Sequence, residues 1–330
     1  MKMEKGTKHR ILYLYAYLIK HTDIDHPLST NQLIKVLQDE FDMHVGRNTI
    51  GDDLAVMKAC DMHVDFHDST QNLYYFDGQT YEVAELKLLI DAIASSKFIT
   101  QRKSDELIAK LLTLTNEHTA ALLRRHTNVA GRIKGDNERG YYIVDAINTA
   151  INCNRKVRFY YTDFDVNKQR FRTNNGEPYT LSPYNLTWDG DYYYVRGFCD
   201  ERQEMRNFRI DRIEGRPDIL NDLMVMPPDD YDPVKYSKEV FRMFDTDEPE
   251  EVVLHCDASV MKSVIDNFGM DVDTTPIDDQ HFEARVMVCT SPTFYRWVFG
   301  FGGKIKIVGP DKILEEYRQR ILEALESTND

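Results

Sequence analysis

The chain has 330 residues, of which 42% are hydrophobic and 29% charged, and these proportions indicate a soluble globular protein of two or three domains. No apolar run approaches the ~18 residues that cross a bilayer, so we expect no membrane partner. The five cysteines are scattered without a CxxC pair, so neither a disulfide framework nor a zinc site is indicated, and we expect a cytoplasmic location. We expect no cofactor and no metal, and a helix rather than a signal peptide at "ILYLYAYLIK".

The formal net charge of −14 is concentrated in one region of the chain. Residues 217–283 hold eighteen acidic and four basic residues, whereas residues 1–60 hold eight of each. The acidic surplus is therefore local, and we interpret it as a solvated face. Basic patches that bind nucleic acid remain possible elsewhere.

Residues 1–78 show the pattern of three helices followed by a β-hairpin. Apolar residues recur at helical spacing over residues 10–20. Ser29 and Gln32 fit a capping box at the start of a second helix, and a third helix follows Gly46. Two alternating runs come next, joined by Ser-Thr-Gln-Asn. Three helices and a wing predict a winged helix-turn-helix DNA-binding domain.

Residues 79–136 predict a helical linker. The runs 83–99 and 104–123 each carry an apolar stripe at i, i+3 and i+4. The polar stretch 124–140 contains glycines and no apolar period, which is typical of a connection to the next domain.

Residues 137–228 predict a helix followed by short strands that are rich in tyrosine and phenylalanine. Asp189-Gly190 is the strongest tight-turn signal among them. Closely spaced strands of this kind indicate a small, strongly bent antiparallel sheet or barrel.

Residues 229–330 begin with loop chemistry and continue with alternating elements. The pattern runs strand, helix, strand, helix, strand, helix over about 80 residues, a length typical of one small domain. This order predicts an α+β domain of the ferredoxin-like kind. The whole chain is therefore expected to be a multidomain α+β protein.

Residues 190–215 combine three consecutive tyrosines with five arginines on one predicted β-hairpin. Guanidinium groups match phosphate oxygens, and tyrosine rings stack on bases with roughly 1–3 kcal/mol per base. Strand alternation places Tyr192, Tyr194 and Arg196 on one face. On the partner strand it places these residues on one face: Arg206, Phe208, Ile210 and Arg212. Two interpretations stay open, an anion-binding surface or a solvated hairpin whose arginines pair with Asp200, Glu201, Glu204, Asp211 and Glu214.

The order of these parts and several motifs resemble the WYL-domain transcriptional regulators of bacteria, over nearly the whole chain. Of the family's Trp-Tyr-Leu signature only the middle tyrosine is kept, as Tyr194. Residues 181–186 resemble the family's Pro-Tyr-x-Leu strand, and residues 297–310 resemble its C-terminal signature. The arginine-rich part of the hairpin matches the pattern that follows the signature: Arg206, Phe208-Arg209 and Asp211-Arg212-Ile213.

The resemblance implies a homodimeric DNA-binding regulator with a winged helix-turn-helix, a helical linker, a small Sm-like β-barrel called the WYL domain and a C-terminal extension domain. It implies that the WYL domain binds a negatively charged effector, a nucleotide or single-stranded nucleic acid, which modulates DNA binding. Together with the chemistry of the hairpin, it favours these effector-binding residues: Ser182, Tyr184, Tyr194, Arg196, Arg206, Arg209 and Arg212.

In the third helix, four residues are placed for contacts to duplex DNA: Arg47, Asn48, Thr49 and Lys58. Asp52 stands where related regulators usually have a basic or polar residue, and a phosphate would repel it. We therefore expect duplex DNA as a partner. The alternative is an accessory protein that binds a nucleotide or nucleic acid and no longer binds operator DNA.

We expect no enzymatic activity. A nuclease would need a cluster of carboxylates for metal, and Asp163 with Asp165 alone does not make one. His255, Cys256 and Asp257 resemble a nucleophile cluster, but they lie on a predicted strand where adjacent side chains point in opposite directions.

Overall fold

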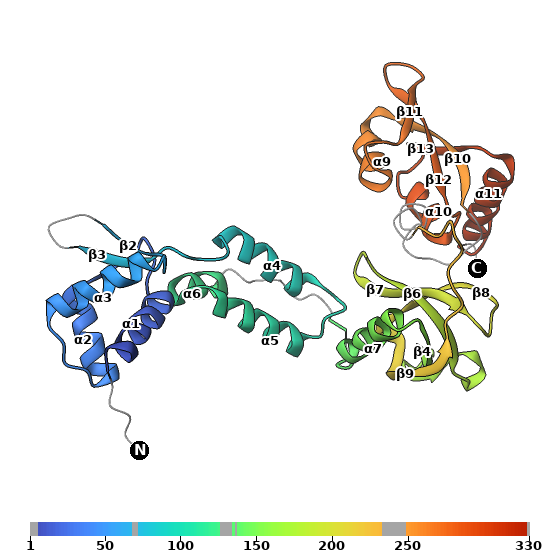
Figure 1. Ribbon diagram of the computed structural model, residues 1–330. Helices are drawn as coiled ribbons and strands as arrows, with labels where there is room; N and C mark the ends of the chain where they lie inside the picture. Colours follow the sequence, from blue (N-terminus) through green and yellow to red (C-terminus); the bar gives the residue numbers. More distant parts are fainter. Residues whose placement is uncertain (1–5, 68–71, 126–133, 136, 233–248, 329–330) are drawn as a thin grey trace. The chain divides into compact units, whose positions relative to one another are not determined.

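The computed structural model describes residues 6–67, 72–125, 134–135, 137–232 and 249–328 (Figure 1). The chain divides into two compact units, residues 1–136 and residues 137–330. Each unit has a hydrophobic core of its own. Within the described ranges, no helix combines the length and the apolar character needed to cross a bilayer.

The first unit begins with three helices and a small sheet. Its elements are α1 (Thr7–His21), β1 (Leu28–Ser29), α2 (Thr30–Phe41), α3 (Arg47–Ala59), β2 (Val64–His67) and β3 (Leu73–Phe76). The strands form an antiparallel sheet in the order β1-β3-β2. β1 was not predicted, because two residues are too few to show a period. The turn expected between β2 and β3 falls mostly on residues 68–71, outside the described part of the chain.

The core of this part follows from helical periodicity. Leu18 of α1, Leu33 of α2 and Ile50 of α3 are fully buried in one cluster. The predicted capping box is confirmed at the start of α2. The backbone N–H of Gln32 donates to Ser29 Oγ (3.4 Å), and the backbone N–H of Ser29 donates to Gln32 Oε1 (2.9 Å).

The rest of the first unit is helical, with α4 (Val83–Ser95), α5 (Gln101–Leu111) and α6 (Glu117–Arg125). The apolar stripe over 104–123 falls on two separate helices, α5 and α6. Asn116 explains the break, since its Oδ1 accepts the backbone N–H of Thr119 (2.9 Å) and so caps a new helix.

Residues on either side of the boundary are tied to their own units. Lys134 Nζ donates to the carbonyl oxygen of Ser96 (2.9 Å) and to two further oxygens of the α4–α5 region. Asn137 Nδ2 donates to the carbonyl oxygens of Asp211 (3.1 Å) and Ile213 (3.3 Å). The anchors of the two units are therefore close together along the chain.

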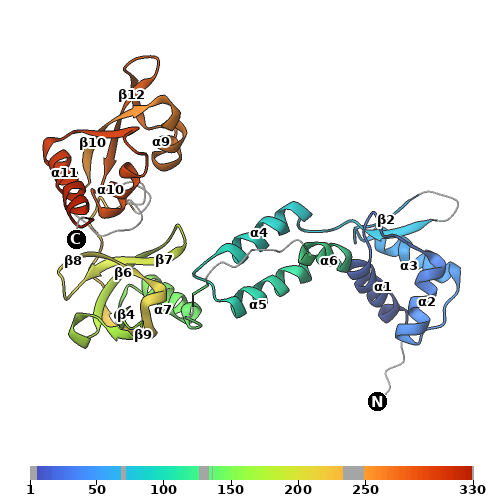
Figure 2. The same ribbon diagram turned by 180° about the vertical axis from the view of Figure 1, so that it is seen from behind.

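The second unit begins with α7 (Gly140–Asn152), β4 (Arg155–Phe164), β5 (Arg170–Arg172), β6 (Tyr179–Asp189), β7 (Tyr192–Cys199), β8 (Glu204–Arg209) and β9 (Ile213–Leu223). The strands pair in the order β5-β4-β6-β7-β8, and β9 returns to pair with β4. The result is a curled antiparallel sheet against which α7 packs (Figures 1 and 2). The predicted strongly bent sheet is confirmed.

The prediction of one strand over residues 204–215 is wrong beyond Arg209. A 3₁₀ turn, η3 (Ile210–Arg212), separates β8 from β9. A 3₁₀ helix repeats every three residues, so η3 interrupts the two-residue alternation of the strand. Arg212 therefore does not continue the face of Arg206 and Phe208.

β6 and β7 approach closely at Gly197. A Cβ on this residue would lie 2.1 Å from the carbonyl oxygen of Ser182, far inside van der Waals contact. Only glycine fits such an approach in the middle of a strand.

The C-terminal part contains β10 (Glu250–Asp257), α9 (Met261–Phe268), β11 (Asp273–Pro276), β12 (His281–Val288), α10 (Pro292–Phe299), β13 (Ile305–Gly309) and α11 (Asp311–Glu326). The sheet is antiparallel in the order β11-β12-β10-β13. Its core joins alternate strand residues to side chains of all three helices. The predicted alternation is present, and β11 is an additional edge strand.

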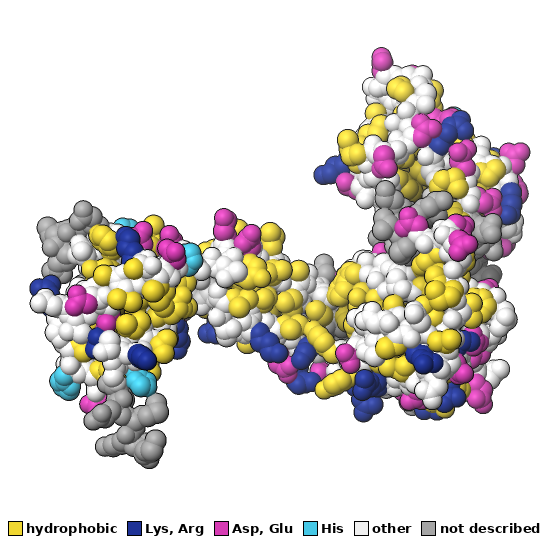
Figure 3. All heavy atoms as spheres, viewed as in Figure 1, with side chains coloured by type: hydrophobic (Ala, Val, Ile, Leu, Met, Phe, Trp, Pro, Cys, Tyr) yellow, Lys and Arg dark blue, Asp and Glu magenta, His cyan; other side chains and the backbone are white. Residues whose placement is uncertain are grey.

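The acidic side chains that the structure describes within residues 217–283 are exposed or half-buried, as expected of solvated groups. This stretch supplies the end of β9 and most of the C-terminal sheet, and every second residue of β10 and β12 is buried. Acidic and basic side chains lie side by side over the C-terminal part of the surface in Figure 3.

Candidate functional site

A polar and aromatic face runs across β6, β7 and β8. The strand register pairs Tyr194 with Arg209 and Arg196 with Asn207, so these side chains lie on one side of the sheet. Val195, between them in β7, is fully buried on the opposite side. We call the first side the outer face, and its residues are Asn185, Thr187, Tyr192, Tyr194, Arg196, Asn207 and Arg209.

Arg209 is held in one position on the outer face. Its guanidinium carbon lies 3.4 Å from the centre of the Tyr192 ring. Its Nε and Nη2 donate to the two carboxylate oxygens of Asp211, at 3.1 and 2.7 Å. Its Nη1 makes no hydrogen bond to any described residue. That nitrogen can donate to an anion without disturbing the other contacts.

The electrostatics of the face keep Arg209 charged and Tyr194 protonated. Burial by itself lowers the pKa of Arg209, but the hydrogen bonds and charge of Asp211 raise it above its ordinary value. Burial raises the pKa of the Tyr194 phenol above its ordinary value. Within the described ranges the Tyr194 hydroxyl has no hydrogen-bond partner. A cationic residue and a tyrosine with a protonated hydroxyl therefore occupy directly paired positions of β7 and β8.

Tyr231, from the segment after β9, lies on the other half of the outer face. Its hydroxyl donates to Asn185 Oδ1. Its ring packs edge-on against Tyr184, with ring centres 5.4 Å apart. Burial raises the pKa of the Tyr231 phenol, and the nearby charge of Arg196 lowers it by a smaller amount. The sequence did not predict this residue, because "PPDDYDP" has the composition of an ordinary loop.

Three of the predicted effector residues do not join this face. Ser182 is fully buried, and its Oγ accepts a backbone N–H from the segment after β9 (3.0 Å). Arg206 Nη2 pairs with Glu204 (2.7 Å). Arg212 Nη1 donates to Asp163 of β4 (3.3 Å). The structure thus brings together Tyr184, Tyr194, Arg196 and Arg209.

Some contacts match the interpretation of a solvated hairpin. Glu204 and Asp211 pair with hairpin arginines, whereas Asp200 and Glu214 pair with basic residues of β4 and β5. The pairing with Asp211 orients Arg209 without using all of its donors.

The residues predicted to contact DNA lie at two ends of α3. Arg47 and Asn48 are exposed at its start, beside a half-buried Thr49. Lys58 lies about 16 Å further along, as eleven residues of helix require. Its ammonium group pairs with Asp65 (3.6 Å) and lies over the Phe66 ring (4.9 Å). Asp52, which is exposed, lies between these two ends.

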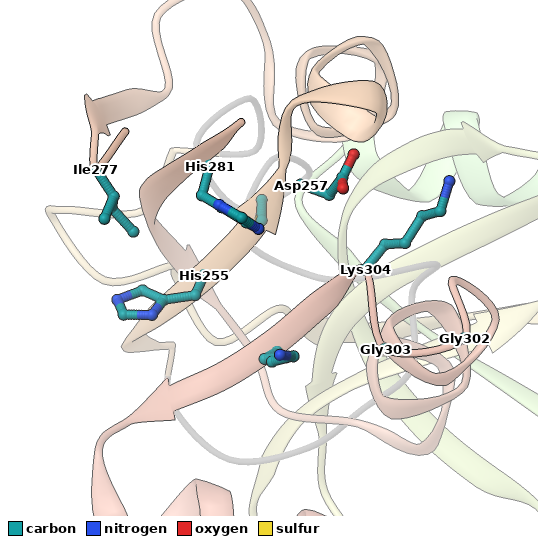
Figure 4. A pocket seen from close by; sticks show the side chains of 9 residues that line it. His255, Asp257, Ile277, His281, Gly302, Gly303 and Lys304 are labelled. Carbon is teal, nitrogen blue, oxygen red and sulfur yellow. The ribbon is translucent and has the colours of Figure 1, made fainter. Parts of the chain in front are cut away.

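A second polar cluster lies in a pocket on the C-terminal sheet (Figure 4). Its lining includes His255, Asp257, His281 and Lys304. Both histidines pair with carboxylates, and Lys304 donates to a serine hydroxyl. Cys256 is buried on the core side, where burial raises the pKa of its thiol to about 12. As the alternation predicted, the cysteine and its two neighbours point in opposite directions.

Two protein-family models match the chain. The WYL domain matches residues 142–216, and the WCX domain matches residues 248–325. The chain therefore contains a WYL domain, which carries β7 and β8 of the outer face, and a WCX domain, which carries the C-terminal sheet. This agrees with the two corresponding parts of the resemblance.

Among solved structures, the chain is similar to the proteasome accessory factor B/C (PafBC) of Arthrobacter aurescens, with 18% identity and a TM-score of 0.29 over 98% of this chain and 49% of that one. The chain thus spans about half the length of that protein. A CRISPR Cas-related protein matches with 14% identity and a TM-score of 0.37, over 100% of this chain and 87% of that one. No curated protein matches the sequence significantly.

Proposed function

We propose that this protein is a DNA-binding transcriptional regulator whose WYL domain binds an anionic effector, a nucleotide or single-stranded nucleic acid. The observation that carries the proposal is the arrangement of Arg209, Tyr192 and Tyr194 on the outer face. A guanidinium that is stacked on a ring and fixed by a carboxylate keeps one nitrogen, Nη1, without a hydrogen bond to the described residues, at a strand position paired with Tyr194.

The chemistry of this arrangement suits a phosphate with an attached base. Arginine binds phosphate oxygens with short, charge-assisted hydrogen bonds. Tyrosine rings add stacking of roughly 1–3 kcal/mol per base, with little dependence on sequence. Because Tyr192 and Asp211 already order Arg209, little side-chain entropy is lost on binding.

The first part of the chain supports the DNA-binding half of the proposal. The order α1-β1-α2-α3-β2-β3 with a three-stranded sheet is that of a winged helix-turn-helix. Arg47, Asn48 and Thr49 would contact the major groove or its phosphates. The strand order β11-β12-β10-β13 supports a ferredoxin-like fold for the C-terminal domain. We also propose that the protein is a cytoplasmic homodimer without enzymatic activity.

A second function is favoured by Asp52, which is exposed on the helix that would enter the groove. A carboxylate there is repelled by phosphates, so the chain could be an accessory protein that binds the effector alone. An electrophoretic mobility shift with the DNA upstream of the chain's own gene separates the two. A retarded complex that is lost in Arg47→Ala supports the regulator, and no complex supports the accessory protein.

The effector half is tested by the anisotropy of a fluorescein-labelled oligo(dT). We expect binding that weakens steeply with salt and falls at least tenfold in Arg209→Lys, because lysine has no planar fork and cannot stack in the same way. Arg216→Ala is the matched control, since Arg216 is an exposed arginine of the same domain that pairs with Asp145 (3.5 Å). Equal binding by the Arg209 variant would refute the site.

A further inference from the structure

Tyr231 divides the outer face into a covered half and an open half. The covered half contains Asn185 and Arg196 of the outer face, and Tyr184 lies beside it. Tyr231 donates to Asn185, packs its ring against Tyr184 and is within the electrostatic influence of Arg196. The open half, with whose described residues Tyr231 makes no hydrogen bond or ring contact, contains Tyr194 and the ordered Arg209, whose side chain is 22% exposed. The two halves are continuous, because Tyr194 and Arg196 project from the same side of β7.

The position of Tyr231 is well defined. Its backbone N–H donates to the carbonyl oxygen of Pro228 (3.0 Å), which closes a turn after β9. Burial raises the pKa of its phenol to about 12, against the opposing effect of Arg196. The hydroxyl is thus a donor over the whole physiological pH range, and the ring is partly removed from water.

The groups beneath Tyr231 are those that would bind a second nucleotide. Tyr184 offers a ring, Arg196 offers a cation, and Asn185 offers an amide that can pair with the edge of a base. Asn185 Nδ2 donates to Thr187 Oγ1 (2.6 Å), which orients its Oδ1 toward Tyr231. An aromatic ring with one hydrogen-bond donor therefore already occupies a place that fits a nucleobase.

We propose that Tyr231 is an intramolecular competitor for the second nucleotide position, so that the outer face discriminates ligands by length. This inference rests on the proposed function, since it names how that same site selects its ligand. A mononucleotide binds at Arg209 and Tyr194 without moving Tyr231. A single strand of several nucleotides displaces the ring and gains Tyr184, Asn185 and Arg196.

Displacement of Tyr231 would also reach beyond the WYL domain. Tyr231 lies in the chain between β9, which ends at Leu223, and β10, which begins at Glu250. The residue that the ligand moves is therefore part of the connection from the WYL domain to the WCX domain. Only ligands long enough to displace Tyr231 would change the conformation of the first residues of this connection.

The test compares Tyr231→Ala and Tyr231→Phe with the unmodified protein, using labelled oligo(dT) by anisotropy and dTMP by calorimetry. We expect Tyr231→Ala to bind oligo(dT) about tenfold more tightly, equivalent to ~1.4 kcal/mol, and to leave dTMP binding unchanged. Tyr231→Phe should fall between, because it keeps the ring and loses the bond to Asn185. Tyr142→Ala, an exposed tyrosine of α7, is the control and should change neither affinity.

Weaker oligo(dT) binding in Tyr231→Ala would overturn the proposal, because Tyr231 would then be a contact for the ligand. Unchanged binding, with loss in the Arg209 variant, would also overturn it while leaving the proposed function standing.

If no variant binds either probe, the proposed class of effector is refuted. The position of Tyr231 over Arg196 is then tested separately by the reactivity of a thiol placed at residue 196. Arg196→Cys, with Cys60 and Cys153 replaced by serine, should react several-fold faster with an aromatic disulfide reagent when Tyr231 is alanine. Equal rates with and without Tyr231 would exclude the cover as well.

Discussion

Arg10 of α1 holds Asp53 of α3 in a two-point ion pair, with Nη2 donating to Oδ1 at 2.9 Å. Both side chains are largely buried, with 12% and 4% of their surface exposed. Asp53 is thus turned into the domain, whereas the preceding Asp52 points to solvent. Two adjacent acidic residues of α3 therefore have opposite environments, one buried against Arg10 and one exposed to solvent.

Removal of one partner of this pair should destabilise the first unit strongly. Arg10→Ala leaves Asp53 as a buried charge without its cation, and we expect a loss of about 3 kcal/mol in the free energy of unfolding. Urea titration followed by circular dichroism measures it. Arg47→Ala, an exposed arginine at the start of α3, should leave the stability unchanged. Equal effects of both substitutions would contradict the assignment.

The exposed Asp52 should weaken DNA binding. Asp52→Asn removes one repulsion with the phosphates, and we expect the affinity for the upstream DNA to rise about fivefold, or ~1 kcal/mol. Lys58→Ala should change it little, because Asp65 and the Phe66 ring already hold that ammonium group. A mobility shift titration at fixed salt gives both values. No gain in Asp52→Asn would show that this part of α3 faces away from DNA.

Glu117 should make the stability of the first unit depend on pH. A hydrogen bond from His21, whose Nδ1 lies 2.8 Å from Oε1, holds the pKa of Glu117 below its ordinary value. A carboxylate with a depressed pKa stabilises the fold above its unfolded pKa of about 4.3 and loses this contribution as pH falls below that value.

Glu117→Gln should therefore be less stable than the unmodified protein at pH 7, and the difference should shrink as pH drops below about 4. Thermal unfolding between pH 3 and 7 measures it. Asp39→Asn, an exposed carboxylate of the same unit, is the control and should show no such difference. A gap that stays constant with pH would rule out the ionised pair.

Gly197→Ala should disrupt the sheet that carries the outer face. The added Cβ would lie 2.1 Å from a backbone oxygen that cannot rotate away, so we expect a loss of about 3 kcal/mol or more. Gly51→Ala should have the opposite sign and stabilise by roughly 0.5–1 kcal/mol, because this helical glycine has open space around it. Calorimetric melting of both variants tests the pair, and a tolerated Gly197→Ala would contradict the close approach.

Periodicity was enough to predict most of the fold. Apolar residues at helical spacing in α1 and α2 and alternating residues in β7 and β10 gave the element types, because burial on one face is what these patterns record. Periodicity does not decide the structure where a local contact overrides it. Asn116 caps a new helix within an apolar stripe, and η3 interrupts a strand pattern at Ile210.

The outer face could be predicted only in part. Strand parity places Tyr192, Tyr194 and Arg196 together, and the register adds Arg209 from β8. Tyr231 could not be predicted, because its position depends on how a loop folds back and no residue pattern within the loop encodes its partner. The burial of Ser182 was also hidden, since it follows from the close approach of two strands.

The residues on either side of the unit boundary are anchored to different parts of the chain. Lys134 is fixed to the helical part of the first unit, and Asn137 is fixed to the carbonyls that flank Arg212, within and just after the turn that follows Arg209. The start of the second unit is therefore tied to the turn that lies between Arg209 and β9, the turn that also carries the Asp211 partner of Arg209.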